Sequence, residues 1–402
     1  MEKSRLALNP YLLLVPLLLV YIGSAVYIQY LLNPTFYIDQ RIYQDAGAKA
    51  VLGQNPYLPF SIPATYVYPP AILPLFAGLN MLPFDLARII WIDINILVYL
   101  SSLLVSWLWL KPAASFRNLL IFGLMLFYGP LFENITIGQV DCLVLLGLVL
   151  FVRSAGQPRY RALGGLGLAL ATLIKFTPGM LLIALLWQCR WRSIGYVVLF
   201  GLVLASVSLL MFGAGPWWDY FQLVPRLITS GSSDPNNQRI TTSLAWFLNS
   251  SEANETVRLV GSLFSVLMVS AWLVTLVWPR RKPELEPVLL LGIVVLTISS
   301  SLIWYHHFLF LIIPLLYLLV KYEQHWLAWI GWGGLAAIQL DRVVEHAFRW
   351  PPVITVAGYL LLFGGMLVVN WLPGLKGREL NQPDYSPAES ARSGFNSRKE
   401  AA

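Results

Sequence analysis

Apolar residues form long runs along this chain, and polar residues gather in the segments between them. A straight membrane-crossing helix needs about 20 apolar residues. The pattern therefore predicts an all-α polytopic membrane protein with about twelve membrane-crossing helices. The predicted runs occupy residues 11–32, 86–110, 118–132, 140–152, 162–174, 178–189, 194–213, 257–278, 287–303, 305–320, 326–340 and 353–372.

Several of these runs are shorter than a full crossing. Those between residues 118 and 189 form two short pairs, each with a polar or Pro/Gly connection. Short, interrupted helices are tolerated in membranes where their backbone lines a cavity inside the protein. The proline-rich segment 69–83 is interpreted as an interfacial or re-entrant piece.

Composition supports lipid as the main solvent of the outer surface. The chain of 402 residues is 57% hydrophobic and 12% charged, with a mean hydropathy of +0.67, whereas soluble domains carry about 25% charged residues. The net charge of +7 comes from basic residues at the ends of apolar runs, which indicates topology rather than nucleic-acid binding. Cys142 and Cys189 are interpreted as packing residues, and the four histidines form no Cys/His cluster that would indicate a metal site.

The basic residues also give the helices a direction. Lys3 and Arg5 precede the first run, which is long enough to be a retained helix rather than a cleaved signal peptide. With the N-terminus cytoplasmic, most Lys and Arg residues fall on inner segments, as the positive-inside rule requires. This predicts a multi-pass cell-membrane domain over 1–381, long outer loops at 33–85 and 214–256, and a flexible cytoplasmic tail over 382–402.

The first outer loop begins with a carboxylate beside an aromatic residue. In a helix, Asp39 and Tyr43 would share a face, while Asp45 would point elsewhere. A carboxylate near apolar walls at the membrane boundary can have a raised pKa and serve as a general base. The alternative is an ordinary acidic residue at a solvated helix N-terminus.

Further along the same loop, turn residues alternate with aromatic residues around Asn55, Tyr57 and Tyr68. Such aromatic faces suit contacts with a sugar or an isoprenoid, or they seat the loop on the membrane. Gln139 and Asp141 join two short helices, and charged groups at membrane depth are usually functional.

Lys175 lies between two helices that are each too short to cross fully, so its ammonium could face a phosphate or extend to the interface.

Arg239 lies in the second long outer loop, and His306 and His307 follow a Trp-Tyr pair at a helix junction. Adjacent side chains point in different directions, so we expect at most one histidine, His306, to face a site. The chain has no P-loop, dinucleotide fingerprint or zinc motif.

The order of these motifs resembles glycosyltransferase family 87, whose members are polyprenyl-phosphate-mannose-dependent mannosyltransferases of the GT-C fold. The likeness spans roughly residues 35–310, and the family often has Asn where this chain has Asp141. The matching motifs are Asp39-x-x-x-Tyr43, Gly53-x-Asn55-Pro56-Tyr57, Tyr68-Pro69-Pro70, Gly138-Gln139-Val140-Asp141, Lys175-x-x-Pro178-Gly179 and Trp304-x-His306-His307.

The resemblance implies a lipid-linked sugar donor, chemistry at the outer face and Asp39 as the general base of an inverting transfer. It implies donor-phosphate contacts from Lys175, Arg239 and His306. The expected substrate contacts are Tyr43, Asn55, Tyr57, Tyr68, Gln139, Asp141 and His307. No metal or other cofactor is implied.

The expected partners are a polyprenyl-phosphate sugar, a lipid or glycan acceptor and membrane lipids, and no nucleic acid. Mannose is the family default, and the acceptor is not indicated. Two other functions stay open at this point: a transporter or flippase of lipid-linked glycans, which would predict internal repeats, and a polysaccharide polymerase or ligase.

Overall fold

The computed structural model describes residues 37–60, 65–229, 237–251, 254–278, 284–300, 303–348 and 353–371. Throughout these ranges the regular structure is helical, as the apolar pattern predicts. The expected first helix at 11–32 and the tail over 382–402 lie outside the described residues.

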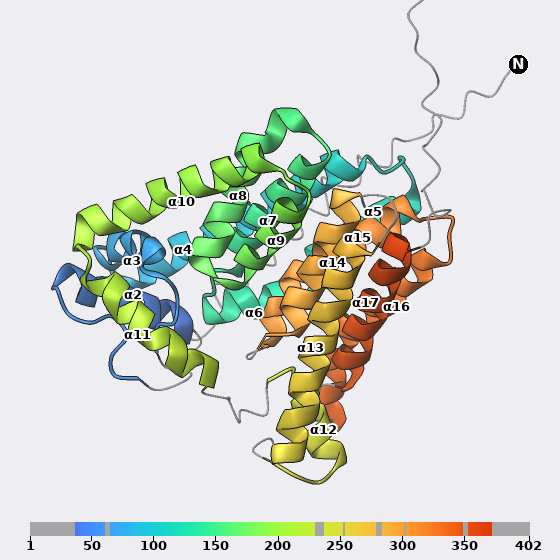
Figure 1. Cartoon of the computed structure of the whole chain (residues 1–402). Coiled ribbons are helices and arrows are strands. Elements are labelled where there is room, and N and C mark those ends of the chain that lie inside the picture. Colours follow the sequence, from blue (N-terminus) through green and yellow to red (C-terminus); the bar gives the residue numbers. More distant parts are fainter. Residues whose placement is uncertain are drawn as a thin grey trace, which may run out of the picture.

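Figure 1 shows the arrangement of the helices, most of which coincide with a predicted apolar run or with part of one. In chain order they are α2 (Ile38–Val51), η2 (Pro70–Ile72), α3 (Leu73–Asn80), α4 (Phe84–Leu110), α5 (Phe116–Leu126), α6 (Gly129–Ile137), α7 (Asp141–Ala155), η3 (Pro158–Tyr160), α8 (Arg161–Ile174), η4 (Thr177–Leu181), α9 (Leu182–Trp187), α10 (Trp191–Phe212), α11 (Gly215–Thr229), α12 (Ile240–Phe247), α13 (Glu255–Val277), α14 (Leu285–Ile298), η5 (Tyr305–Leu311), α15 (Ile312–Lys321), α16 (Leu327–Phe348) and α17 (Val353–Trp371).

Five helical stretches of the described chain are long and apolar enough to cross a membrane. They are Phe84–Leu110, Phe116–Ile137, Trp191–Phe212, Glu255–Val277 and Val353–Trp371. Shorter apolar helices lie between them, so the chain has the character of a multi-pass membrane protein, while the total of about twelve crossings stays a prediction. The two long loops expected to lie outside contain helices of their own, α2 and α3 in the first and α11 and α12 in the second.

The short helices α7 and α8 pack directly against one another. Glycines make this close approach possible: a Cβ on Gly147 would lie 2.4 Å from the carbonyl oxygen of Gly167. Because consecutive helices joined by a short connection run antiparallel, the start of α7 lies beside the end of α8. Asp141 and Lys175 are thereby brought to the same end of the pair.

The apolar centre of the molecule includes α14, η5 and α15. Nearly every residue of α14 is buried, in keeping with a helix that is apolar all round. It contacts α7, α13, α15, α17 and η5 (Figure 1). The sequence predicts one continuous run over 305–320, but its first half is a 3-10 helix and only Ile312–Lys321 is α-helical.

The turn between α6 and α7 presses against α2. Gly138 ends α6 with φ of 79°, a left-handed conformation that favours glycine, and a Cβ there would lie 2.7 Å from the Cβ of Gln40. The indole Nε1 of Trp91 donates to the carbonyl oxygen of Gly138 at 2.8 Å. The close contact between Gly138 and Gln40 fixes the distance between α2 and the residues that follow Gly138.

We expect Gly138→Ala to lower the unfolding temperature in detergent clearly more than Gly53→Ala. Both glycines have positive φ, so both changes strain the backbone by roughly 1–3 kcal/mol, but no heavy atom lies within 4 Å of a Cβ at Gly53. The difference in unfolding temperature between the two variants measures how much the contact of Gly138 with α2 matters for stability. Equal losses would show that this contact is unimportant.

Candidate functional site

Five segments that are far apart in the sequence converge on one polar cluster. They are α2, the stretch 65–69 that precedes η2, α6 with the α6–α7 turn, the α8–η4 turn and the start of η5. They contribute a set of polar side chains in an otherwise apolar interior: Asp39, Tyr43, Tyr68, Glu133, Gln139, Asp141, Lys175, His306 and His307.

Gln139 connects the predicted base to two tyrosines. The hydroxyls of Tyr43 and Tyr68 both lie within hydrogen-bonding distance of Gln139 Oε1, at 2.7 and 2.8 Å. Because hydroxyls can donate to this oxygen, the Nε2 group is turned toward Asp39 and donates to its Oδ2 at 2.6 Å. Asp39 and Tyr43 share a face of α2, as their spacing predicts, and both contact the same amide.

Asp45 points away from this cluster, also as predicted. Its side chain is 62% exposed and pairs with Lys49 one turn later on the surface of α2. α2 therefore presents one carboxylate to the cluster and one to its surroundings.

The α6–α7 turn is held by Asn134. Its backbone carbonyl accepts from the N–H of Gln139 at 2.8 Å, and its side-chain Oδ1 accepts from the N–H of Asp141 at 3.2 Å. These bonds satisfy backbone groups that would otherwise be unpaired at the ends of the two helices. They also fix the directions of the Gln139 and Asp141 side chains.

Burial raises the pKa of the Asp39 carboxyl above its usual value. Nearby His306, the hydrogen bond from Gln139 and the charge of Lys175 oppose this rise, while Asp141 adds to it. A carboxylate with a raised pKa is a better proton acceptor once it is ionised. This is the electrostatic property that a general base requires.

Lys175 and Asp141 form a buried ion pair. Lys175 Nζ lies 2.6 Å from Asp141 Oδ1, and the two side chains are 11% and 0% exposed. The ammonium also lies 5.9 Å from the ring centre of Tyr68 and 5.6 Å from that of Phe310. Lys175 is thus directed into the cluster and not toward the interface.

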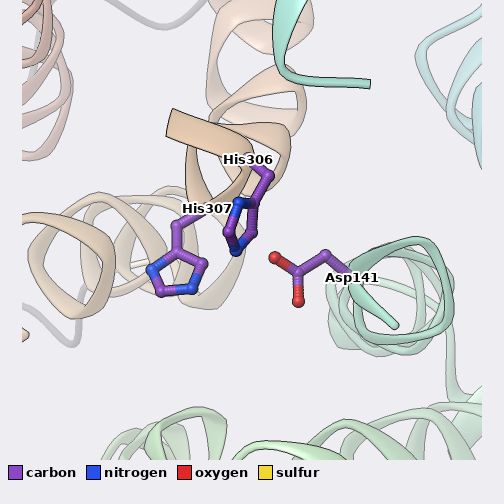
Figure 2. Close-up of side chains that lie close together, drawn as sticks. All are labelled: Asp141, His306 and His307. Atoms are coloured by element: carbon purple, nitrogen blue, oxygen red, sulfur yellow. The ribbon is translucent and has the colours of Figure 1, made fainter. Parts of the chain in front are cut away.

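His306 and His307 both lie beside Asp141 (Figure 2). Each of the three residues offers one atom, and these atoms lie within 4.8 Å of one another. The two rings are nearly perpendicular, with centres 4.6 Å apart. Both rings therefore lie near the Asp141 carboxylate, and which of them faces a substrate stays a prediction.

The hydrogen positions on the two rings follow from their partners. His306 Nδ1 lies 3.4 Å from Glu133 Oε1, and because an ionised carboxylate can only accept, this contact favours the tautomer with a hydrogen on Nδ1. His307 Nδ1 accepts from the backbone N–H of Trp304 at 3.4 Å, which places its own hydrogen on Nε2.

Asp141, His306 and His307 are also the residues of the described chain that could hold a metal ion. However, an Nε2–H on His307 is a donor, and a metal ligand must present a lone pair. In this tautomer His307 offers a donor to a sugar hydroxyl or a phosphate oxygen, while the Asp141 carboxylate is already paired with Lys175 at 2.6 Å.

The predicted aromatic contacts form a buried layer behind Gln139. Tyr57 is 2% exposed, donates to the carbonyl oxygen of Tyr68 at 3.0 Å and packs on Tyr66 with ring centres 5.5 Å apart. Asn55 accepts from the backbone N–H of Tyr57 at 2.8 Å and so shapes the turn. In this arrangement the observed partners of these residues are protein groups, and their roles in substrate binding stay predictions.

Arg239 is the residue directly before α12, at its N-cap position. The preceding residue, Gln238, donates its backbone N–H to the carbonyl oxygen of Ile303 at 2.6 Å, and Asn237 Oδ1 accepts from the N–H of Ile303 at 3.1 Å. These bonds join the second long loop to the segment that carries His306. The predicted contact of Arg239 with a phosphate stays a prediction.

Sequence reasoning left Glu133 and Asn134 out of the expected site residues. Glu133 orients His306, and Asn134 holds the turn that carries Gln139 and Asp141. The available signal was a Glu-Asn pair inside an apolar run, four or more residues before the Gln139 motif.

We expect Gln139→Leu to lower kcat/KM about tenfold, because a hydrogen bond to a charged group contributes about 1.5–3 kcal/mol. Loss of the Gln139 bond also raises the pKa of Asp39 further. Activity needs the ionised carboxylate, so the acid limb of the pH profile should move to higher pH. Gln44→Leu is the matched control, because Gln44 lies on the same helix as Asp39 and its Nε2 donates to the Leu79 carbonyl oxygen of α3 rather than to the carboxylate. If the pH profile of Gln139→Leu were unshifted, Gln139 would not influence the ionisation of Asp39.

Comparisons with known proteins identify the family of this chain. The family model of glycosyltransferase family 87 matches residues 66–301. The chain is 25% identical over 364 residues, 85% of this chain and 86% of the relative, to the polyprenol-phosphate-mannose-dependent alpha-(1-2)-phosphatidylinositol pentamannoside mannosyltransferase of Mycolicibacterium smegmatis. It is 24% identical over 336 residues to the enzyme of that description from Mycobacterium tuberculosis, 77% of this chain and 73% of the relative. This protein belongs to glycosyltransferase family 87.

Proposed function

We propose that this chain transfers mannose from a polyprenyl-phosphate mannose donor to a hydroxyl group of a lipid or glycan acceptor at the outer face of the membrane. The observation that carries the proposal is the Asp39 carboxylate, which Gln139 orients at 2.6 Å beside the Lys175 and His306 cluster. A proton acceptor and groups suited to a phosphate are the two parts that such a transfer needs.

The proposed reaction inverts the anomeric centre. The acceptor hydroxyl oxygen forms a bond to the anomeric carbon and gives its proton to Asp39. The bond between that carbon and the donor phosphate oxygen breaks, and the phosphate keeps the electron pair. The positive charge that develops on the sugar lies between the Asp39 carboxylate and the departing phosphate.

Lys175, Arg239 and His306 are proposed to stabilise the departing phosphate. Lys175 is paired with Asp141 in the present arrangement, so the phosphate would share the ammonium with that carboxylate. His307 presents Nε2–H on the same side of Asp141, where it could bind a phosphate oxygen or a sugar hydroxyl. No step in this scheme calls for a metal or another cofactor.

Two features favour this function over a flippase or a polysaccharide polymerase. Family membership supports a glycosyltransferase, and the two mycobacterial relatives are named as polyprenol-phosphate-mannose-dependent mannosyltransferases. The acceptors in those names are phosphatidylinositol mannosides, so a lipid carrying mannose is the first acceptor to test.

The test is mass spectrometry of products formed by the purified protein in proteoliposomes. We expect a mannose-sized mass increase of the acceptor with polyprenyl-phosphate mannose and none with GDP-mannose. Polyprenyl-phosphate glucose serves as the control for sugar selectivity. Transfer from GDP-mannose alone would overturn the donor assignment, and movement of lipid-linked sugar across the bilayer without a new glycosidic bond would support the flippase.

A further inference from the structure

The start of α2 and the start of α4 bring two arginines and two aromatic rings together. The guanidinium carbon of Arg88 lies 5.2 Å from the ring centre of Tyr37, and that of Arg41 lies 4.6 Å from the ring centre of Phe84. We infer that Arg41 and Arg88, here called the arginine pair, bind the phosphodiester of an anionic acceptor lipid. The inference rests on the proposed function.

The spacing of these residues explains how they meet. Tyr37, at the N-cap of α2, precedes Arg41 by four residues. Phe84, the first residue of α4, likewise precedes Arg88 by four residues. Side chains at this spacing share a helix face. Because each cation lies on a ring of the other segment, both guanidinium groups belong to the contact between the two faces.

This contact contains hydrogen-bond donors that have no acceptor among the described residues. They are the buried hydroxyl of Tyr37 and the buried Nη1 of Arg88. Gln40, one turn after Tyr37, is fully buried, and its amide nitrogen also has no partner there. A buried donor without an acceptor destabilises a protein. A phosphate group has several acceptor oxygens, so it would satisfy the guanidinium and the hydroxyl together.

The protein partner of Arg88 leaves its charge available to a ligand. Nη2 of Arg88 lies 3.3 Å from Oδ1 of Asp85, but the Asp85 side chain is 77% exposed. An ion pair with such an exposed partner contributes little. The Arg88 side chain is 14% exposed, so an anion can reach it from the surroundings of the protein. Burial raises the pKa of the Tyr37 phenol, and the Arg88 charge opposes this rise.

The position of the arginine pair suits a lipid phosphate. α4 begins at Phe84 and is long and apolar enough to cross a membrane, and the end of a membrane-crossing helix lies at the depth of the lipid headgroups. Ile38, Leu86 and Ile89 are exposed apolar side chains of the same two segments, where they can contact acyl chains. Arginines at the predicted outer end of a helix run against the positive-inside rule, and a bound phosphate would account for them.

The location of Asp39 favours the acceptor over the donor. Asp39 follows Tyr37 by two residues, and its carboxylate is turned toward Gln139 on another side of α2. A helix with its side chains is about 10–12 Å wide. An acceptor with one or two rings between its phosphate and its reacting hydroxyl could therefore bind the arginine pair and still reach Asp39. The donor phosphate is already assigned to the Lys175 side of the cluster.

The experiment compares two acceptors that each carry one mannose. Phosphatidylinositol monomannoside has the phosphodiester, and mannosyl diacylglycerol lacks it. Arg88→Gln should raise KM for the first roughly tenfold and leave KM for the second and for the donor within about twofold. Arg88→Lys keeps the charge and should recover part of the loss. Arg258→Gln is the matched control, because Arg258 is an exposed arginine at the start of α13, also on the predicted outer side.

Tyr37→Phe is a second variant that keeps the ring beside Arg88 and removes only the hydroxyl. It should fold normally and raise KM for phosphatidylinositol monomannoside alone, by about threefold or more. If the unaltered protein used this acceptor and not mannosyl diacylglycerol, that preference would support the inference, with the donor KM as the comparison.

A raised KM for the donor would assign the arginine pair to the donor phosphate and overturn the inference. Equal effects on the two acceptors, or no effect on either, would make the pair a purely structural contact. Both results would leave the proposed transfer standing. If the unaltered protein transferred mannose neither to these acceptors nor to phosphatidylinositol pentamannoside, the proposed function itself would be refuted.

Discussion

Asp39→Asn should abolish sugar transfer, with kcat at least about a thousandfold below that of the unaltered protein. A positioned general base contributes about a factor of 100 to 10,000, and the amide cannot take the proton of the acceptor hydroxyl. The replacement keeps the size of the side chain, and its carbonyl oxygen can still accept from Gln139, which now donates to Asp39 at 2.6 Å. We therefore expect normal folded yield and little change in KM for the donor.

The measurement is initial-rate transfer in proteoliposomes at several pH values, together with the unfolding temperature. Asp45→Asn is the matched control, because that carboxylate lies on the same helix and is 62% exposed. The control should retain nearly full activity. If Asp39→Asn kept full transfer at normal folded yield, Asp39 would not be the base and the proposed mechanism would fail.

The fold follows from the sequence wherever an apolar run has the length and flanking residues of a membrane helix. The run predicted over 86–110 is found as Phe84–Leu110, and the one over 257–278 as Glu255–Val277. The break within 305–320 could not be predicted in this way. All residues of η5 except the two histidines are aromatic or leucine, so no change in polarity marks where the 3-10 helix becomes α-helical.

In the candidate site, too, helical spacing predicts contacts within one helix but not contacts between distant segments. The shared face of Asp39 and Tyr43 depends only on helical spacing, and the structure has it. The pairing of Lys175 with Asp141 depends on the close packing of α7 and α8, and the convergence of His306 and His307 depends on where η5 lies. Such contacts between distant segments are fixed by packing geometry, which residue spacing does not contain.

Lys175→Met should lower both stability and activity. Removing one partner of a buried ion pair leaves a charge without compensation and costs about 3–5 kcal/mol, and here it would leave the Asp141 carboxylate unpaired at 0% exposure. We expect a clearly lower unfolding temperature. If Lys175 also stabilises the departing phosphate, kcat should fall by about a hundredfold or more.

The double variant Lys175→Met with Asp141→Asn separates these two effects. It contains no buried unpaired charge, so we expect most of the lost stability to return while transfer stays low. Lys49→Met controls for the loss of an exposed ion pair, which contributes only about 0–1 kcal/mol, because its partner Asp45 is 62% exposed. Recovery of transfer in the double variant would assign Lys175 a purely structural role, since the ammonium would then be dispensable once Asp141 is neutral.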